Sequence, residues 1–295
     1  MDLTRPLFPN SVSVMPLAKP MIALASALVL VGSAPATALR VMTFNLRYIT
    51  SDDKGPKAWV ARRDQAAEVI KTDNPDIVGV QEALAPALND LTDRLPGYTV
   101  LGTGRENGND KGEYSAILVK SARFRIQKSG TFWLSATPDI PDSRTWGNRV
   151  TRICTWAVML DRETGKPLRF FNTHLDHESP EARQKGMELI LSRIAEGPAT
   201  SPVVLTGDFN CVDTDTPSMA IKAGGLIDVW HALHADTPAA ESGTFHQFKG
   251  TRNLARIDFI YASPTLSAQA AEIIRSSVNG NYPSDHFPVR ATLGY

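Results

Sequence analysis

Short apolar runs alternate with a few amphipathic segments from residue 39 to the end of the chain. Runs rich in β-branched and aromatic residues predict strands at 39–46, 76–82, 114–120, 124–134, 153–160, 168–175, 202–206, 256–262, 268–275 and 287–293. Apolar residues at helical spacing predict helices at 59–71, 84–95 and 180–196. No repeat or interdomain linker interrupts the pattern, although 102–112 is a loop rich in glycine and charge. We therefore expect one α+β domain in which two largely antiparallel sheets pack together with helices outside them.

The first 38 residues have the composition of a secretory signal peptide. Arg5 and Lys19 precede an apolar stretch at 21–31, and Ala36-Thr37-Ala38 is a cleavage site of the small-x-small type. This stretch is shorter than the roughly 20 residues that a membrane span needs, which leaves an uncleaved anchor as the alternative. We expect a mature domain at 39–295 that is periplasmic or secreted, with no stable membrane insertion.

Charge and cysteine content exclude few functions. Lys and Arg together number 31, as do Asp and Glu, so the formal net charge is zero. A dedicated nucleic-acid binder usually carries a basic face or tail, and neither is evident. An exported protein would permit a disulfide between Cys154 and Cys211, but two small, inert packing residues are the simpler interpretation. We expect a monomer.

Polar residues stand at the ends of several predicted strands. The clearest pair is Asp208 and Asn210, which follow the buried run 202–206 and lie two residues apart, so strand alternation would aim them at the same side. A role in capping the next loop is the alternative, because Asp and Asn both favour turns. Other strand ends carry Asn45, Glu82, His174, Asp176, His177, Asp258, Asp285 and His286. One shared cleft on a rigid scaffold is the economical explanation.

These polar residues belong to six short motifs that occur in a fixed order. They are Met42-Thr-Phe-Asn45-Leu-Arg47, Val80-Gln81-Glu82, Asn172-Thr-His174-Leu-Asp176, Thr206-Gly-Asp208-Phe-Asn210, Ile257-Asp258-Phe-Ile and Ser284-Asp285-His286-Phe-Pro-Val. With them, residues 39–295 resemble the endonuclease/exonuclease/phosphatase superfamily of metal-dependent, DNase I-like phosphoesterases. The resemblance implies a four-layer αββα sandwich and hydrolysis of a phosphate ester with Mg²⁺, for which Mn²⁺ can substitute.

The resemblance also implies a metal site. Glu82 would be the principal ligand, with Asn45 and Asp285 nearby. Hard carboxylate oxygens suit this expectation, because Mg²⁺ prefers oxygen ligands to imidazole or thiolate. Asn45 would also face the substrate.

Catalytic roles follow from the same resemblance. His286 and Asp208 would jointly activate the attacking water, and which of the two takes the proton is left open. Asn210 and His174 would donate hydrogen bonds to the phosphoryl oxygens as charge develops. Asp258 would orient the histidine base, and Asp285 could influence the position and basicity of His286.

Two segments concern the substrate. Arg47 stands where many nucleases of the superfamily carry an acidic or amide residue, so a second metal site is in doubt and Arg47 could contact a substrate phosphate instead. The segment 142–152 is rich in arginine, and we expect Arg152 to point into the cleft. A solvated loop is the alternative for this segment.

The sequence thus predicts an exported Mg²⁺-dependent hydrolase and favours a phosphodiesterase or nuclease. The enzyme would use an activated water and no covalent intermediate. Its substrate would be a nucleic acid, a nucleotide or a lipid headgroup. The alternatives are a phosphomonoesterase, a sphingomyelinase-like phospholipase C, and a binding protein that keeps the fold without catalysis. A zinc site of His174, Asp176 and His177 is disfavoured, because the two histidines would face opposite sides of a strand.

Overall fold

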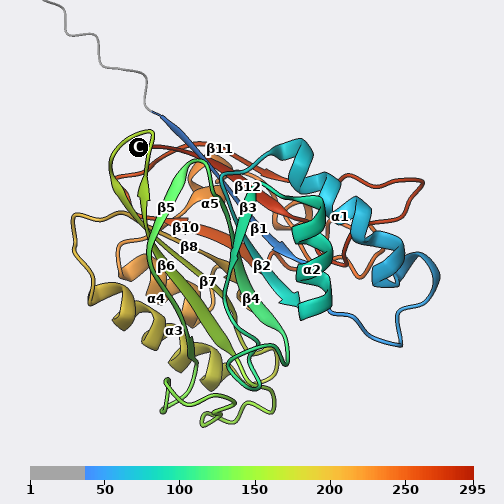
Figure 1. The fold of residues 1–295 in the computed structure, drawn as a ribbon, viewed down its shortest axis with the longest axis horizontal. Coiled ribbons are helices and arrows are strands. Elements are labelled where there is room, and N and C mark those ends of the chain that lie inside the picture. Colours follow the sequence, from blue (N-terminus) through green and yellow to red (C-terminus); the bar gives the residue numbers. More distant parts are fainter. Residues whose placement is uncertain (1–36) are drawn as a thin grey trace, which may run out of the picture. The chain divides into compact units, whose positions relative to one another are not determined.

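The computed structural model describes residues 37–295, so the predicted signal peptide at 1–38 lies almost entirely outside the described residues. This part of the chain forms two sheets of six strands each (Figure 1). The first sheet has the order β11 (Ser267–Ile273), β12 (Val289–Gly294), β1 (Ala38–Asn45), β2 (Ile77–Ala83), β4 (Tyr114–Lys120) and β3 (Tyr98–Leu101). The second has the order β5 (Phe124–Trp133), β6 (Ile153–Asp161), β7 (Pro167–His174), β8 (Val203–Asp208), β10 (Asp258–Ala262) and β9 (Ile227–Asp228).

Each sheet contains one parallel pair among antiparallel neighbours. β1 and β2 are parallel and are joined through α1 (Trp59–Asp73), whereas β7 and β8 are parallel and are joined through α3 (Pro180–Ala195). The remaining helices are α2 (Ala85–Arg94), α4 (Thr216–Ala223) and α5 (Val229–Leu233), with short 3-10 turns at η1 (Gly55–Lys57) and η2 (Ala239–Glu241). Because the parallel strands run in the same direction, their carboxyl ends meet at one edge of each sheet.

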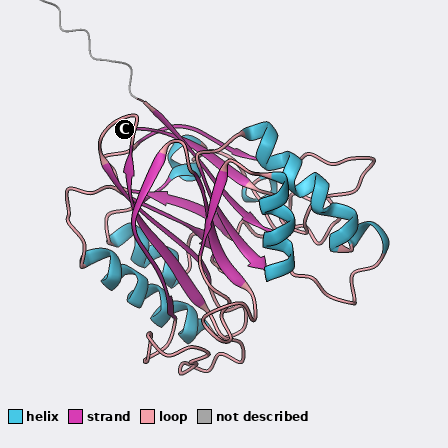
Figure 2. Cartoon of the chain, in the orientation of Figure 1, coloured by secondary structure: helices cyan, strands magenta, loops and turns pink. Residues whose placement is uncertain are grey.

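Three apolar clusters fill the interfaces of this arrangement. Between the sheets, side chains such as Val41 from β1 and Phe170 from β7 meet in one cluster. α1 and α2 cover the outer face of the first sheet through residues such as Ile70 and Leu91. α3 and α4 cover the outer face of the second sheet (Figure 2). Met187 is fully buried there. The expected four-layer αββα sandwich is confirmed.

The predicted helices and strands are all present, with ends that differ by at most two residues. β12 begins at Val289 rather than at Phe287, because the Phe287 backbone N–H donates to Thr244 and Pro288 has no N–H to offer a neighbouring strand. The sequence analysis missed β3, β9, α4 and α5, which are two to eight residues long. Elements this short show too few periods of a hydrophobic pattern to be recognised.

Helix α3 shows how the sequence determines an element's start. Ser179 precedes it with extended backbone, and its hydroxyl accepts a hydrogen bond from the Ala182 N–H at 3.1 Å. Pro180 occupies the first helical position, where the missing N–H costs nothing. The helix therefore begins where the capping signal lies.

Asn172 in β7 links the two sheets beneath the cleft described below. Its side-chain nitrogen donates to the backbone oxygens of Val80 and Ala116, both at 2.9 Å. Its Oδ1 accepts from Gln81 Nε2 at 2.7 Å and from Thr206 Oγ1 at 3.0 Å. All four hydrogen bonds are buried, so the network specifies the position of one sheet on the other and also stabilises their packing.

The two sheets approach each other closely at this point. A Cβ atom on Gly79 would stand 2.3 Å from Thr206 Oγ1 and 2.5 Å from Asn172 Oδ1. Real Cβ atoms do not come this close to other heavy atoms, so only glycine fits opposite the Asn172 network.

Both cysteines are buried free thiols. Burial raises the pKa of Cys154 and raises that of Cys211 to about 11, which keeps both in the unreactive thiol form. They are packing residues, as the simpler interpretation expected. Among residues 37–295, no helix combines the length and the apolar character that a bilayer crossing demands.

Replacement of Asn172 by alanine should lower the free energy of unfolding by about 2–4 kcal/mol, because it leaves buried carbonyl and amide groups without partners. Urea unfolding followed by circular dichroism measures this. Gln127→Ala, at an exposed position of β5, is the control and should change stability by less than about 0.5 kcal/mol. A loss no larger than the control's would contradict the role given to the network.

Candidate active site

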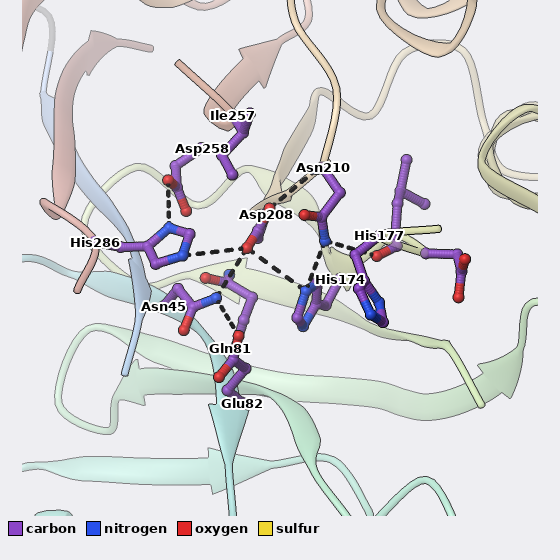
Figure 3. A network of polar contacts seen from close by, with 12 residues as sticks. Asn45, Gln81, Glu82, His174, His177, Asp208, Asn210, Ile257, Asp258 and His286 are labelled. Carbon is purple, nitrogen blue, oxygen red and sulfur yellow. Dashed lines mark hydrogen bonds and ion pairs between the residues drawn. The ribbon is translucent and has the colours of Figure 1, made fainter. Parts of the chain in front are cut away.

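The predicted polar residues gather where the carboxyl ends of the parallel strands meet. Asp208 ends β8, and its neighbours in the sheet are His174 of β7 and Asp258 of β10, which stand directly opposite it. Asn45 and Glu82 reach the same point from the first sheet. Figure 3 shows Asp208 between the two imidazoles of His174 and His286. The sheet register alone therefore places Asp208 at the centre of the group.

Asp208 is buried and makes contacts on every side. Its Oδ2 accepts a hydrogen bond from Asn45 Nδ2 at 2.8 Å, and it lies 3.5 Å from His174 Nε2 and 3.8 Å from His286 Nε2. Its Oδ1 accepts from the Asn210 N–H at 3.0 Å. Burial and the negative charge of Asp258 raise the pKa of Asp208 to about 7. Near neutral pH this carboxylate can therefore take up or release a proton.

His286 is held by Asp258. Its Nδ1 lies 2.9 Å from Asp258 Oδ2, and both side chains are buried. Burial alone would lower the pKa of His286, but the charge of Asp258 and the hydrogen bond outweigh it and raise that pKa well above its ordinary value. This environment favours the imidazolium form of His286, and its Nε2 faces the side of Asp208.

The pKa of His174 is shifted in the opposite direction to that of His286. Burial and the positive charge of Arg152 hold the pKa of His174 well below its ordinary value. Asn210 lies 2.9 Å from His174 Nε2 through its Nδ2, which also donates to the Leu175 carbonyl at 3.0 Å. Nε2 of the neutral ring is then the acceptor, so the proton of His174 resides on Nδ1.

Glu82 stands at a break in β2. The register with β4 shifts between Val80 and Ala83, and Glu82 has a left-handed backbone with φ of 59°. This geometry turns its carboxylate toward the cleft, where Oε1 accepts from Asn45 Nδ2 and Oε2 accepts from the Tyr48 N–H, both at 2.9 Å. Strained backbone of this kind persists where the surrounding structure supports it, and it is common at functional sites.

Several side-chain atoms that could bind a metal face one another here. Glu82, Asp208 and His286 each offer an atom within 4.8 Å of the others. Asp285 lines the same cleft, and burial raises its pKa, to which the charge of Glu82 adds. Asn45 bridges Glu82 and Asp208 through Nδ2, while its Oδ1 accepts from the Arg47 N–H at 2.9 Å. The carboxylates are crowded as in sites that accommodate a hard divalent cation.

Arg62 of α1 fixes the loops that carry these groups. Its fully buried guanidinium donates to the carbonyl oxygens of Leu46, Arg47 and Pro283, the last at 3.0 Å. Ser284 Oγ in turn donates to the Asn45 carbonyl at 2.6 Å. The loop after β1 and the segment before His286 are therefore held together by hydrogen bonds from Arg62 and Ser284 to backbone carbonyl groups.

The cleft has a volume of about 580 Å³, which is in the range of small-molecule sites. Arg47 lies in its wall and pairs with Asp53 at 3.0 Å. Arg152 also lines it, as the sequence predicted for that side chain. Among the described residues, the cleft brings together the predicted residues Arg47, Glu82, Arg152, His174, Asp208, Asn210, Asp285 and His286, with Asn45 and Asp258 in contact behind them.

The sequence analysis missed several wall residues. Phe245 packs on His286 with ring centroids 4.9 Å apart, and Tyr48 supplies a backbone N–H to Glu82. Arg105 and Glu113 flank the glycine-rich loop and pair with each other at 2.7 and 2.9 Å. The one available signal was an arginine and a glutamate at the two ends of that loop, and it does not reveal which strand ends the loop will approach.

Two geometric arguments from the sequence were wrong. β7 ends at His174, so His177 does not sit on a strand, and both histidines line the cleft instead of facing opposite sides. Asp176 accepts hydrogen bonds from the Glu178 and Ser179 N–H groups, which makes it a turn residue.

The second error concerns Asn210. β8 ends at Asp208, and a left-handed Asn210, with φ of 46°, turns the chain. Asp208 and Asn210 therefore come together through a tight turn and not through strand alternation.

Asp258→Asn should lower the pKa of His286 by roughly 1–3 pH units, because the main charge that stabilises the imidazolium is removed. NMR titration of the His286 ring protons in the metal-free protein measures this. Since the folded-state pKa is raised, the Asp258–His286 pair stabilises the fold fully below about pH 6.5 and ceases to do so as the pH rises through that pKa. An unchanged His286 titration would refute the assignment.

Comparison with known proteins identifies the family of this chain. The sequence profile of the Endonuclease/Exonuclease/phosphatase family matches residues 42–286. Tyrosyl-DNA phosphodiesterase 2 of Gallus gallus is 24% identical over 230 residues, which are 72% of this chain and 57% of that protein. The chain thus spans a little over half the length of this curated relative.

Solved structures show the same fold. The mannosyl-6-phosphatase of Bacteroides thetaiotaomicron VPI-5482 is 35% identical with a TM-score of 0.81, over 87% of this chain and 100% of that one. D. rerio TDP2, complexed with single strand DNA product, is 19% identical with a TM-score of 0.69, over 88% of this chain and 100% of that one, and this likeness shows the fold alone. From the matching profile and the shared architecture, we conclude that the chain belongs to the endonuclease/exonuclease/phosphatase family.

Proposed function

We propose that this protein hydrolyses phosphate esters by direct attack of a water molecule on phosphorus. The observation that carries the proposal is the pairing of a buried carboxylate near its titration point, Asp208, with a nearby imidazolium, His286, 3.8 Å away. One group can accept the proton of water while the other stabilises the charge that develops on the phosphoryl oxygens.

A divalent cation, Mg²⁺ or Mn²⁺, fits the donor set. Glu82 is the proposed principal ligand, with Asp285 and Asn45 beside it. Burial and the nearby charge of Glu82 raise the pKa of Asp285, and a cation would favour its ionised form. His286 is unsuited to bind the metal, because a protonated imidazole has no free lone pair. When bound, the cation supplies Lewis-acid polarisation of a phosphoryl oxygen.

The chain's own residues divide the remaining tasks. Asp208 takes the proton from water, and Asp258 keeps His286 protonated so that its Nε2 N–H donates to the phosphoryl group. As the water oxygen bonds to phosphorus, the bond from phosphorus to the ester oxygen breaks, and the departing oxygen takes a proton from solvent. Asn210 fixes the neutral His174 with its proton on Nδ1, where no other described group accepts it. Of the two candidates for the general base, Asp208 is thus the proton acceptor, and His286 is the hydrogen-bond donor to the phosphoryl group.

A compact phosphate monoester is the proposed substrate class. The relative with 35% identity is a mannosyl-6-phosphatase, the cleft has the volume of a small-molecule site, and the net charge is zero. Cleavage of a phosphodiester is the second candidate, favoured by the similarity to tyrosyl-DNA phosphodiesterase 2. We further propose that the chain acts as a monomer after export to the periplasm or the medium.

Hydrolysis of p-nitrophenyl phosphate and bis-p-nitrophenyl phosphate tests the reaction and its metal dependence. Both Mg²⁺ and Mn²⁺ should support turnover, EDTA should abolish it, and readdition of metal should restore it. Faster cleavage of the monoester supports a phosphomonoesterase, whereas faster cleavage of the diester supports the second candidate. Turnover that persists unchanged in EDTA would contradict the metal site.

Asp208→Asn, His286→Ala and Glu82→Gln should each lower kcat/KM by about 100-fold or more, because each removes a proton acceptor, a charged donor or the principal metal ligand. Asp93→Asn, at an exposed position of α2, is the matched control and should retain wild-type activity. Circular dichroism of each variant verifies the fold. Full activity in any of the three would remove that residue from the mechanism.

A further inference from the structure

Arg152 is a buried cation that is only partly satisfied. It precedes β6, lines the cleft and is 5% exposed. Its Nη2 lies 2.8 Å from His177 Nδ1, whereas Nε and Nη1 are buried without a hydrogen-bond partner. Asp176 Oδ2 is 3.6 Å from Nε, beyond hydrogen-bonding distance. Buried donors without acceptors cost free energy, and a ligand that supplies an acceptor recovers it.

The wall around Arg152 has no net charge. Arg105 and Glu113 form a two-pronged ion pair, and Asp176 balances Arg152. A second phosphate group placed here would meet the carboxylates of Glu113 and Asp176 as well as the two guanidinium groups, so the wall offers it no net attraction. A neutral hydroxyl group both donates and accepts, so it can satisfy Arg152 and Glu113 at once.

This wall adjoins the reaction centre. His174 Nδ1 is 4.0 Å from Glu113 Oε2, and His174 Nε2 is 3.5 Å from Asp208 Oδ2. One imidazole therefore separates the wall from the carboxylate that is proposed to activate water. A group esterified to a phosphate at Asp208 has room to extend along the wall.

We propose that Arg152, with His177 and the Arg105–Glu113 pair, forms a subsite for the hydroxyl groups of a sugar-type leaving group and thereby determines substrate specificity. The inference rests on the proposed phosphoesterase function and names the chemistry of its leaving group. Aryl phosphates and lipid esters lack hydroxyl groups at this position and leave the Arg152 donors unpartnered. Arg152 acts on specificity and takes no part in the proton transfers.

The test compares two substrates on the same protein preparation. The ratio of kcat/KM for mannose 6-phosphate and glucose 6-phosphate to that for p-nitrophenyl phosphate is independent of the fraction of folded enzyme. Arg152→Gln should lower this ratio by about 10-fold to 100-fold. The variant loses a hydrogen bond from a charged donor to a sugar hydroxyl, which p-nitrophenyl phosphate does not make. Arg152→Lys, which keeps the positive charge but lacks the planar guanidinium group, should restore part of the ratio.

Arg144→Gln is the control in the same loop, since Arg144 is exposed and donates to the Arg149 carbonyl, and it should leave the ratio unchanged. If Arg152→Gln cannot be isolated, His177→Ala removes the partner of Nη2 and should lower the ratio in the same direction. A ratio within about threefold of wild type for Arg152→Gln, or for His177→Ala in its place, overturns the inference.

Two further outcomes separate the inference from the function on which it rests. Faster turnover of a hexose bisphosphate than of the monophosphates would overturn the neutral-hydroxyl assignment and indicate an anion subsite. If the wild-type protein with Mg²⁺ or Mn²⁺ hydrolyses p-nitrophenyl phosphate but neither hexose phosphate, the inference fails and the phosphoesterase function stands. If it hydrolyses neither these monoesters nor bis-p-nitrophenyl phosphate, the proposed function itself fails.

Discussion

The hydrogen bond from Asn45 to Asp208 joins the two sheets at the point where their functional residues meet. Its length is 2.8 Å, and both side chains are buried. Asn45 comes from β1 and also donates to Glu82, so the proposed metal-binding side and the proposed water-activating side share one amide group. The geometry of the cleft therefore depends on how the sheets stack, and the Asn172 network directly beneath it holds that stacking in place.

The same fold makes two histidines electrostatically different. His286 lies beside Asp258 and is charged, whereas His174 lies near Arg152 and is neutral. Both rings are buried, so the charged neighbour decides the sign of the difference. Pairs of titratable groups whose environments separate their pKa values are a feature of sites that perform acid and base chemistry at one pH.

Much of the fold was predictable because its long strands carry clear apolar runs and the six motifs occur in family order. The residues at strand ends were predictable for the same reason, since Asp208 and His174 follow such runs directly. The turn at Asn210 was not, because a left-handed residue interrupts the strand period at a position where no glycine signals it. The end of β7 at His174 was not predictable either, because the apolar Leu175 continues the run beyond it. Arg105 and Glu113 could not be assigned either, since only the tertiary path of their loop brings them to the cleft.

The central claim is that Glu82 and Asp208 mark the two sides of one metal-assisted phosphoryl site. A crystal structure of the protein with Mn²⁺ and phosphate, with an anomalous difference map at the manganese edge, tests it most directly. The account predicts a manganese peak against the Glu82 carboxylate and phosphate density between that peak and His286. A manganese peak bound elsewhere on the protein, with the Glu82 side of the cleft holding no metal, would contradict it.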